Sequence, residues 1–203
     1  MKIFLISFLI LLNFCDQKSQ NNFSFREKKE VAIQEINKIP KEKISEMKNF
    51  LKNKKYNKDL VIFINFKINS GKNRFFLYDL KGDKILEAGL VAHGSGSEVA
   101  GKSELQFSNI ENSYQSSLGK YAIQNSYNGT FGKAYRLKGL EKSNSNAMKR
   151  SIVLHSYSSV PDAELETPIV RSLGCPMLSP NFFKTISKYL DQSKKPIIID
   201  AYY

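Results

Sequence analysis

The sequence predicts a mostly β protein, built as a sandwich or barrel, with a short N-terminal helical segment and one C-terminal helix. From residue 59 onward, short apolar segments recur at close intervals, and Gly, Asn or Ser residues separate them. Many short strands with such turn residues are typical of all-β proteins rather than of alternating strands and helices. Apolar residues at helical spacing occur before this region and again near its end.

Two stretches carry the helical pattern. In the Lys/Glu-rich stretch before residue 58, four apolar residues predict a short amphipathic helix packed on the domain: Ile44, Met47, Phe50 and Leu51. The charged segment before Pro40 predicts a second helical piece, because proline interrupts a helix. Ser179-Pro180 is typical of a helix start, with serine as the cap and proline in the first turn. Three apolar residues then line one face of that helix: Phe183, Ile186 and Leu190.

The strand pattern begins in "DLVIFINFKI", residues 59–68. Its apolar residues alternate with others, so four of them share one face: Ile62, Ile64, Phe66 and Ile68. Asn65 and Lys67 are expected on the opposite face. Further strands are expected, in chain order, in "RFFLYDL", "ILEAGLVA", "ELQFSN", "GKYAIQ", "AYRLKGL", "SIVLHSY" and "KPIIIDAYY".

The first fifteen residues, "MKIFLISFLILLNFC", resemble a bacterial lipoprotein signal. One lysine precedes an apolar run that is short for a membrane span but suits the core of a secretory signal. The signal closes on Cys15, the expected lipid attachment point, although Asn13 and Phe14 depart from the small residues usual before it. Simple cleavage nearby, or retention as an anchor, is the alternative. We expect an exported protein of the bacterial cell envelope, anchored to a membrane through its lipid and facing the periplasm or the surface.

The net charge of +12 favours an anionic environment such as acidic lipid or wall polymer, or it serves solubility alone. No helix-turn-helix, zinc-finger or aromatic RNA-binding motif accompanies this charge, so we expect no nucleic-acid partner. Residues 16–58 are expected to form a polar tether followed by the charged helical segment, and residues 59–203 the folded domain.

Cys175 has no disulfide partner if Cys15 carries lipid, which leaves an unpaired thiol in an oxidising compartment. Such a thiol is either buried and inert or used in chemistry. His155 ends an apolar run, so it lies near a strand end, twenty residues before the cysteine. An imidazole in contact with a thiol takes its proton and leaves a thiolate–imidazolium pair, the working state of cysteine acyl-transfer enzymes. Gly174 gives the backbone beside the thiol freedom to turn.

These residues resemble a known family. The pattern "HS", residues 155–156, followed by "RSLGCP", residues 171–176, is similar to the catalytic motif of the murein L,D-transpeptidases, the YkuD-type family, in the branch whose box reads R-S-x-G-C-P. Further segments occur in the order that this branch shows: "AHGSGS", "FSN", "SSLGKYAI", "YRLKGLE" and "NAMKRSIVLH". The commoner family box carries histidine where this chain has Leu173, so His155 alone would serve as base.

The resemblance implies that residues 59–203 form a catalytic domain acting on peptidoglycan stem peptides. It implies Cys175 as nucleophile, His155 as general base and the Ser156 carbonyl as the group that orients the imidazole. The amides of Gly174 and Cys175 would form the oxyanion hole. No cofactor is implied, and no spacing supports a metal site.

Three residues are candidates for substrate binding. Arg171 has a planar fork suited to a stem carboxylate, or it fixes the loop. Ser172 lies beside it in the same box. His93, in a Gly/Ser loop, either faces substrate or is a hydrogen-bonded structural histidine.

Three functions remain open from the sequence. The leading one is an L,D-transpeptidase, which passes the acyl group of a stem tetrapeptide to an amine of a neighbouring stem. An L,D-carboxypeptidase would use the same site with water as acceptor. A catalytically silent wall-binding lipoprotein would leave the thiol unreactive.

Overall fold

The computed structural model describes residues 38–102 and 104–203. The expected signal with Cys15, most of the polar tether and almost all of the segment before Pro40 lie outside these residues. Within them, no helix has both the length and the apolar character needed to cross a membrane.

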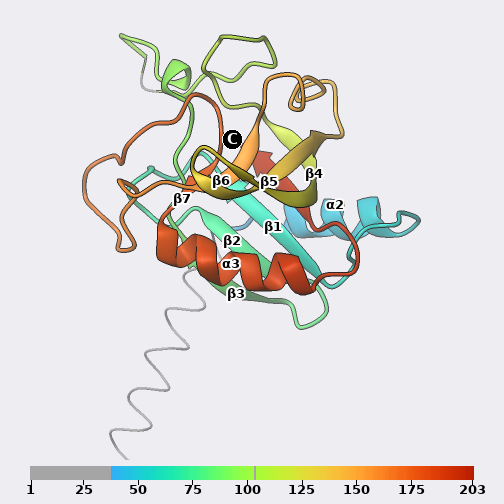
Figure 1. Ribbon diagram of the computed structural model, residues 1–203. Coiled ribbons are helices and arrows are strands. Elements are labelled where there is room, and N and C mark those ends of the chain that lie inside the picture. Colours follow the sequence, from blue (N-terminus) through green and yellow to red (C-terminus); the bar gives the residue numbers. More distant parts are fainter. Residues whose placement is uncertain (1–37, 103) are drawn as a thin grey trace, which may run out of the picture. The chain divides into compact units, whose positions relative to one another are not determined.

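The described residues form a mostly β fold around one eight-stranded sheet, whose strand order is β3-β2-β1-β8-β4-β5-β6-β7 (Figure 1). The strands are β1 (Leu60–Asn65), β2 (Phe75–Asp79), β3 (Lys84–Gly89), β4 (Gly119–Gly129), β5 (Gly132–Gly139), β6 (Val153–Ser156), β7 (Met177–Leu178) and β8 (Ile198–Tyr202). Neighbouring strands are antiparallel except at two places, where β1 pairs with β8 and β6 with β7.

The sheet curves into a nearly closed barrel. Ala92, just after β3, forms an antiparallel bridge with Met177 of β7, so the two ends of the strand order meet. A second bridge joins Gly94 to Ser172. A short 3-10 helix, η1 (Ser95–Ser97), follows at once. The closure therefore ties the segment around residue 93 directly to the loop that precedes β7.

Two helices pack on the barrel, as the sequence predicts. Helix α2 (Lys41–Leu51) buries Met47 and Leu51, and the ammonium group of Lys43 lies 5.5 Å from the ring centroid of Tyr202 in β8. Helix α3 (Pro180–Gln192) starts at Ser179, whose Oγ accepts a hydrogen bond from the Phe182 amide at 3.1 Å. The buried face of α3 contains the three predicted apolar residues.

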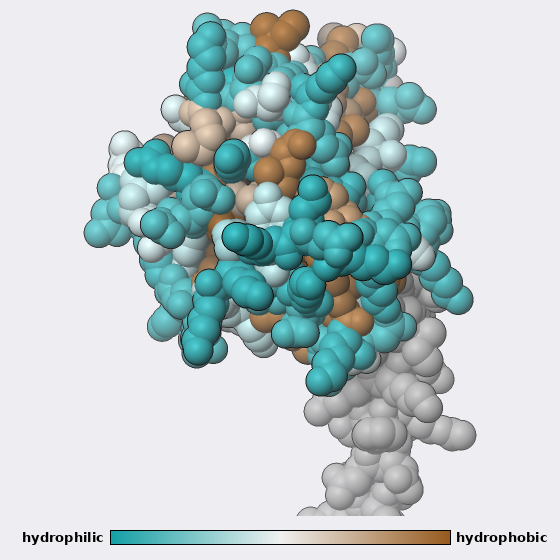
Figure 2. Space-filling model, turned by 90° about the vertical axis from the view of Figure 1, so that its right-hand side faces the viewer, coloured by the Kyte–Doolittle hydropathy of each residue, from teal (hydrophilic) through white to brown (hydrophobic). Residues whose placement is uncertain are grey.

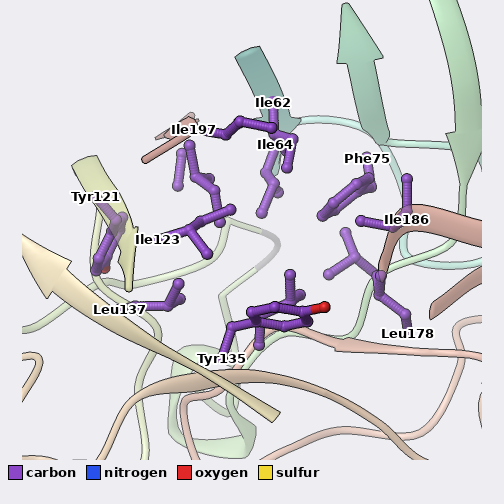
Figure 3. Close-up of a cluster of buried hydrophobic side chains, with 14 of the residues drawn as sticks. Ile62, Ile64, Phe75, Tyr121, Ile123, Tyr135, Leu137, Leu178, Ile186 and Ile197 are labelled. Carbon is purple, nitrogen blue, oxygen red and sulfur yellow. The ribbon is translucent and has the colours of Figure 1, made fainter. Parts of the chain in front are cut away.

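The main core lies inside the barrel, where side chains from β1, β2, β4, β5, β7 and α3 converge (Figure 3). Ile62 and Ile64 point into it as the alternation predicts, and Ile186 of α3 joins them. Each such side chain stabilises the fold by roughly 1.5–3 kcal/mol through removal from water. Hydrophilic side chains cover most of the face in Figure 2, and apolar residues appear there as separate patches.

Three expectations about elements are wrong. Strand β1 ends at Asn65, so Phe66 and Ile68 lie in the following turn, and Asn65 is buried because both faces of β1 are covered. Residues 104–109 form no strand. The apolar pattern there includes Phe107, whose ring packs on Phe66 and Tyr203 in the absence of a strand. The two-residue strand β7 was not expected, since it is too short to give a periodic pattern.

Candidate active site

The loop that carries the thiol needs glycine beside it. Gly174 has φ +119°, a conformation that side chains of L-residues rarely adopt. A Cβ at this position would lie 3.0 Å from the carbonyl oxygen of Gln115. The backbone of Gly94 also packs here, since a Cβ on it would come within 2.9 Å of the Gly174 Cα. Cys175 therefore follows a tight backbone turn that packs against the segments of Gly94 and Gln115.

Cys175 is half-buried, and its sulfur lies beside Val153, the first residue of β6. Sγ donates to the carbonyl oxygen of Ser151 at 3.7 Å and accepts from the amide of Val153 at 3.5 Å. The side chain also packs against the main core. It is neither sealed in apolar packing nor free in solvent.

Burial raises the pKa of the Cys175 thiol above its ordinary value. The Val153 amide and the charge of Arg150 oppose this effect without overcoming it. Arg150 itself is held by main-chain oxygens, donating to Ser108 O at 2.8 Å and to Gln115 O. The resting sulfur is therefore a protonated thiol at neutral pH.

His155 is buried in β6, and its Nδ1 lies 3.0 Å from the carbonyl oxygen of Ser156. A carbonyl only accepts hydrogen bonds, so Nδ1 carries the proton and Nε2 keeps its lone pair. Burial lowers the pKa of the imidazole, and the bond to Ser156 opposes this only in part. The ring is accordingly neutral near neutral pH, with Nε2 as its basic atom.

An aromatic ring that the sequence analysis missed covers the imidazole. Phe131, in the turn between β4 and β5, stacks on His155 with ring centroids 5.2 Å apart and planes 23° apart. The rings of Tyr157 and Phe131 are nearly perpendicular, with centroids 6.0 Å apart. Phe131 is 58% exposed, so this side chain lies at the surface beside the base. No local pattern indicates this stack, because it joins residues from a hairpin tip and a strand more than twenty positions later.

The strand register places the base and the thiol on neighbouring segments. β6 and β7 run parallel with His155 opposite Met177, two residues after Cys175, and the His155 amide donates to Pro176 O at 3.5 Å. Within residues 38–102 and 104–203 no hydrogen bond joins the imidazole to Sγ. The hydrogen bonds of the sulfur go instead to the Val153 amide and the Ser151 carbonyl. The expected thiolate–imidazolium pair is therefore not the resting state.

The expected oxyanion hole also differs in part. The amide of Gly174 donates to Ser172 Oγ at 3.0 Å, so this N–H is already used within the loop. The amide of Cys175 has no acceptor among the described residues. Ser172 therefore braces the turn, and only the Cys175 amide is open to a ligand oxygen.

The remaining candidates lie together in a chain of polar contacts. His93 is buried between Arg74, whose Nη2 lies 2.8 Å from Nδ1, and Glu98, whose Oε1 lies 3.0 Å from Nε2. Arg74 only donates, so Nε2 of His93 carries the proton. Arg171 donates from Nη1 to Glu98 Oε2 at 2.7 Å. Burial first, and then the positive charge of Arg74, lower the pKa of His93 to about 4. Both ring nitrogens of His93 are therefore engaged in hydrogen bonds within the protein.

Potential metal ligands do not gather anywhere in the described part of the chain: no group of three or more His, Cys, Asp or Glu side chains lies together.

The chain belongs to the L,D-transpeptidase catalytic domain family, because the YkuD_2 family model of that description matches residues 32–199. The family that the sequence resemblance predicted is thereby confirmed. No curated protein matches the chain.

Several solved structures are similar in fold. One is described as the Ldtfm-avibactam carbamoyl enzyme, with 12% identity, a TM-score of 0.44 and coverage of 71% of this chain and 49% of that chain. An L,D-transpeptidase from Mycobacterium smegmatis has 11% identity, a TM-score of 0.42 and coverage of 71% and 59%. The helical cell shape determining protein Pgp2 from Campylobacter jejuni has 15% identity, a TM-score of 0.43 and coverage of 78% and 54%. This chain spans about half the length of these proteins.

The two histidines are predicted to be opposite tautomers. In nitrogen-detected NMR of the full chain, we expect His155 as the Nδ1–H form and His93 as the Nε2–H form, because each faces one obligate partner. Both should titrate below the ordinary imidazole pKa of about 6.5, and His93 near 4. An Nε2–H form of His155, or a pKa above the ordinary value, would contradict this geometry.

The thiol is predicted to react slowly near neutral pH. Iodoacetamide attacks through the thiolate, so labelling of Cys175 should accelerate only as the pH rises past the ordinary thiol pKa of about 8.5. His155→Ala should leave that midpoint unchanged, since no hydrogen bond joins the two side chains. Mass spectrometry of the labelled peptide measures the rate, and Cys175→Ala reports labelling at Cys15. A lower midpoint that rises in His155→Ala would instead indicate an ion pair.

Proposed function

We propose that this chain is a peptidoglycan L,D-transpeptidase in which Cys175 is the nucleophile and His155 the general base. The observation that carries the proposal is the parallel β6–β7 register, which pairs His155 with Met177, two residues after Cys175. The basic atom of His155 is Nε2, because Nδ1 donates to the Ser156 carbonyl. Family membership supports the reaction class. The substrate is the stem peptide of the cell wall, and its L,D peptide bond is the one cleaved.

The proton transfer begins from a neutral pair. Both pKa shifts favour the thiol and the imidazole over their ions, so the proton moves only when substrate approaches. The mechanism therefore requires Sγ to turn from Val153 toward His155, by rotation of the cysteine side chain about its Cα–Cβ bond. Catalytic hydrogen bonds that are long or absent in a free enzyme commonly tighten in the substrate complex.

The chemistry then follows in two halves. Nε2 of His155 takes the thiol proton as Sγ attacks the carbonyl carbon, and the resulting oxyanion accepts a hydrogen bond from the Cys175 amide. His155 returns the proton to the leaving amine as the peptide bond breaks, which releases the terminal D-residue and leaves a thioester. An amine of a neighbouring stem then attacks the thioester and regenerates the thiol, forming a cross-link.

Two neighbours keep His155 ready for this role. The Ser156 carbonyl holds the proton on Nδ1, and Phe131 stacks on one face of the ring. Together they fix the tautomer and the plane of the imidazole. Arg171 is proposed as a binding group for a stem carboxylate. Ser172 and His93 act indirectly, by bracing the turn and by fixing Glu98.

The N-terminal residues are proposed to bring the domain to the cell wall. Residues 1–15 would be a lipoprotein-type signal with Cys15 as the acylated residue, residues 16–58 the tether and charged helical segment, and residues 59–203 the catalytic domain. The protein would then be held at a membrane of the bacterial cell envelope while its domain reaches peptidoglycan.

Alanine variants test the assignment. Cys175→Ala should abolish product formation from tetrapeptide muropeptides, and His155→Ala should lower the rate by about 10²–10⁴-fold, the usual contribution of a general base. Lys188→Ala, on the exposed face of α3, is the matched control and should keep full activity. Mass spectrometry of the products gives the rates.

The same experiment separates the other functions. Cross-linked dimers support the transpeptidase, whereas tripeptide monomers alone would indicate an L,D-carboxypeptidase. Unchanged turnover in Cys175→Ala would reject both. No turnover by the native chain, with its fold intact, would favour a silent wall-binding lipoprotein.

A further inference from the structure

A large cavity among the described residues lies apart from the thiol. Its volume is about 700 Å³, and neither Cys175 nor His155 lines it. It is lined by residues 66–70, 74, 93, 98–102, 104, 105, 168, 171 and 203. A volume of this size is typical of pockets that hold a small organic ligand rather than a bare ion.

Cationic side chains with unused donors line this cavity. Arg171 spends one N–H, from Nη1, on Glu98, and its Nε and Nη2 have no partner within the described residues. The ammonium groups of Lys67 and Lys102 likewise have no described partner. Against these cations the lining offers two side-chain carboxylates, Glu98 and Glu104.

Main-chain amides and a buried arginine add further hydrogen-bond donors and positive charge to the cavity. The amides of Asn69 and Ser70 have no acceptor in the part of the chain that the structure describes, although Ser70 is buried. Behind them, Arg74 is 1% exposed and is held by the carbonyl oxygens of Ile68 and Val91. No described carboxylate contacts its guanidinium, so its charge contributes a positive potential to the cavity. A cavity rich in donors and positive charge favours an anionic ligand.

Glu98 shows how a carboxylate is bound at this place. One of its oxygens accepts from His93 Nε2 and the other from Arg171 Nη1. The unused Nε and Nη2 of Arg171 form the second edge of its planar fork, which suits another carboxylate. His93 is neutral, so it adds no charge and keeps Glu98 in position.

The cavity lies close to the nucleophile loop. Ser172 exchanges main-chain hydrogen bonds with His93 and Ser95, at 2.8 and 2.7 Å. Gly94 packs directly on Gly174, the residue before the thiol. From Arg171 to Cys175 the chain itself can span at most about 14 Å, which is the reach of a peptide of about four residues.

We propose that this cavity is a subsite for a free carboxylate of a stem peptide, bound by the open edge of Arg171 with Lys67 and Lys102 beside it. The subsite rests on the proposed function for the identity of the peptide. Its role is to hold the anionic part of the substrate while another part of the same peptide meets Cys175.

Binding to a chemically inactive chain tests this subsite. Full-length Cys175→Ala is titrated by calorimetry with a tetrapeptide muropeptide and with the same muropeptide after methylamidation of its carboxylates. We expect amidation to weaken binding about tenfold or more, because a charge-assisted pair is lost. Arg171→Ala in the same background should bind both forms with the weaker affinity, and Lys67→Ala should show a smaller loss. Lys188→Ala is the control and should match the parent.

Each outcome bears on one claim. Equal affinity for the acid and the amide, or an unaffected Arg171→Ala, overturns the subsite. Inorganic phosphate binding as tightly as the muropeptide would also overturn it, since the cavity would then be a general anion site. If the native chain lacks turnover while acid-dependent binding persists, the proposed chemistry fails and the subsite stands. If turnover occurs without acid-dependent binding, the subsite alone fails.

Discussion

The parallel pairing of β6 with β7 is the constraint on which the candidate site depends. It fixes His155 opposite Met177 and brings the turn at Cys175 against the start of β6. Gly174, with its positive φ, allows this turn, and Gly94 and Gln115 close around it. Barrel closure through the Ala92–Met177 bridge then attaches the His93 segment to the same loop. A small displacement of β7 would therefore move the thiol, the turn and the cavity wall together.

Burial acts on the thiol and on the imidazole in complementary ways. It raises the pKa of Cys175 and lowers that of His155, so both groups rest uncharged. A neutral thiol is less open to oxidation, because the thiolate is the reactive form. The Ser156 carbonyl keeps the basic nitrogen of His155 unprotonated, and Phe131 restrains the ring. The proposed mechanism therefore requires the substrate to bring the proton acceptor and the sulfur together.

The sequence predicted the elements that depend on residues close together in the chain. The Ser179 cap, the apolar face of α3 and most strands follow from periodicity and turn residues, and the family motif identified the region of Cys175 and His155. Contacts between distant segments were beyond such reasoning. Phe107 packs on Phe66 and Tyr203 without forming a strand, Phe131 stacks across a hairpin, and Arg74 is buried beside His93. The side-chain direction of Cys175 also depends on burial and on the Ser151 carbonyl, which no spacing encodes.

A covalent intermediate on the sulfur is the most direct consequence of this account. The full chain is incubated with a tetrapeptide muropeptide, quenched in acid and weighed intact, with the modified peptide then mapped by fragmentation. A mass increase equal to the muropeptide without its terminal residue, located on Cys175, is the predicted result. An unmodified chain that nevertheless converts the muropeptide, or an adduct on any other side chain, would contradict the central role of this thiol.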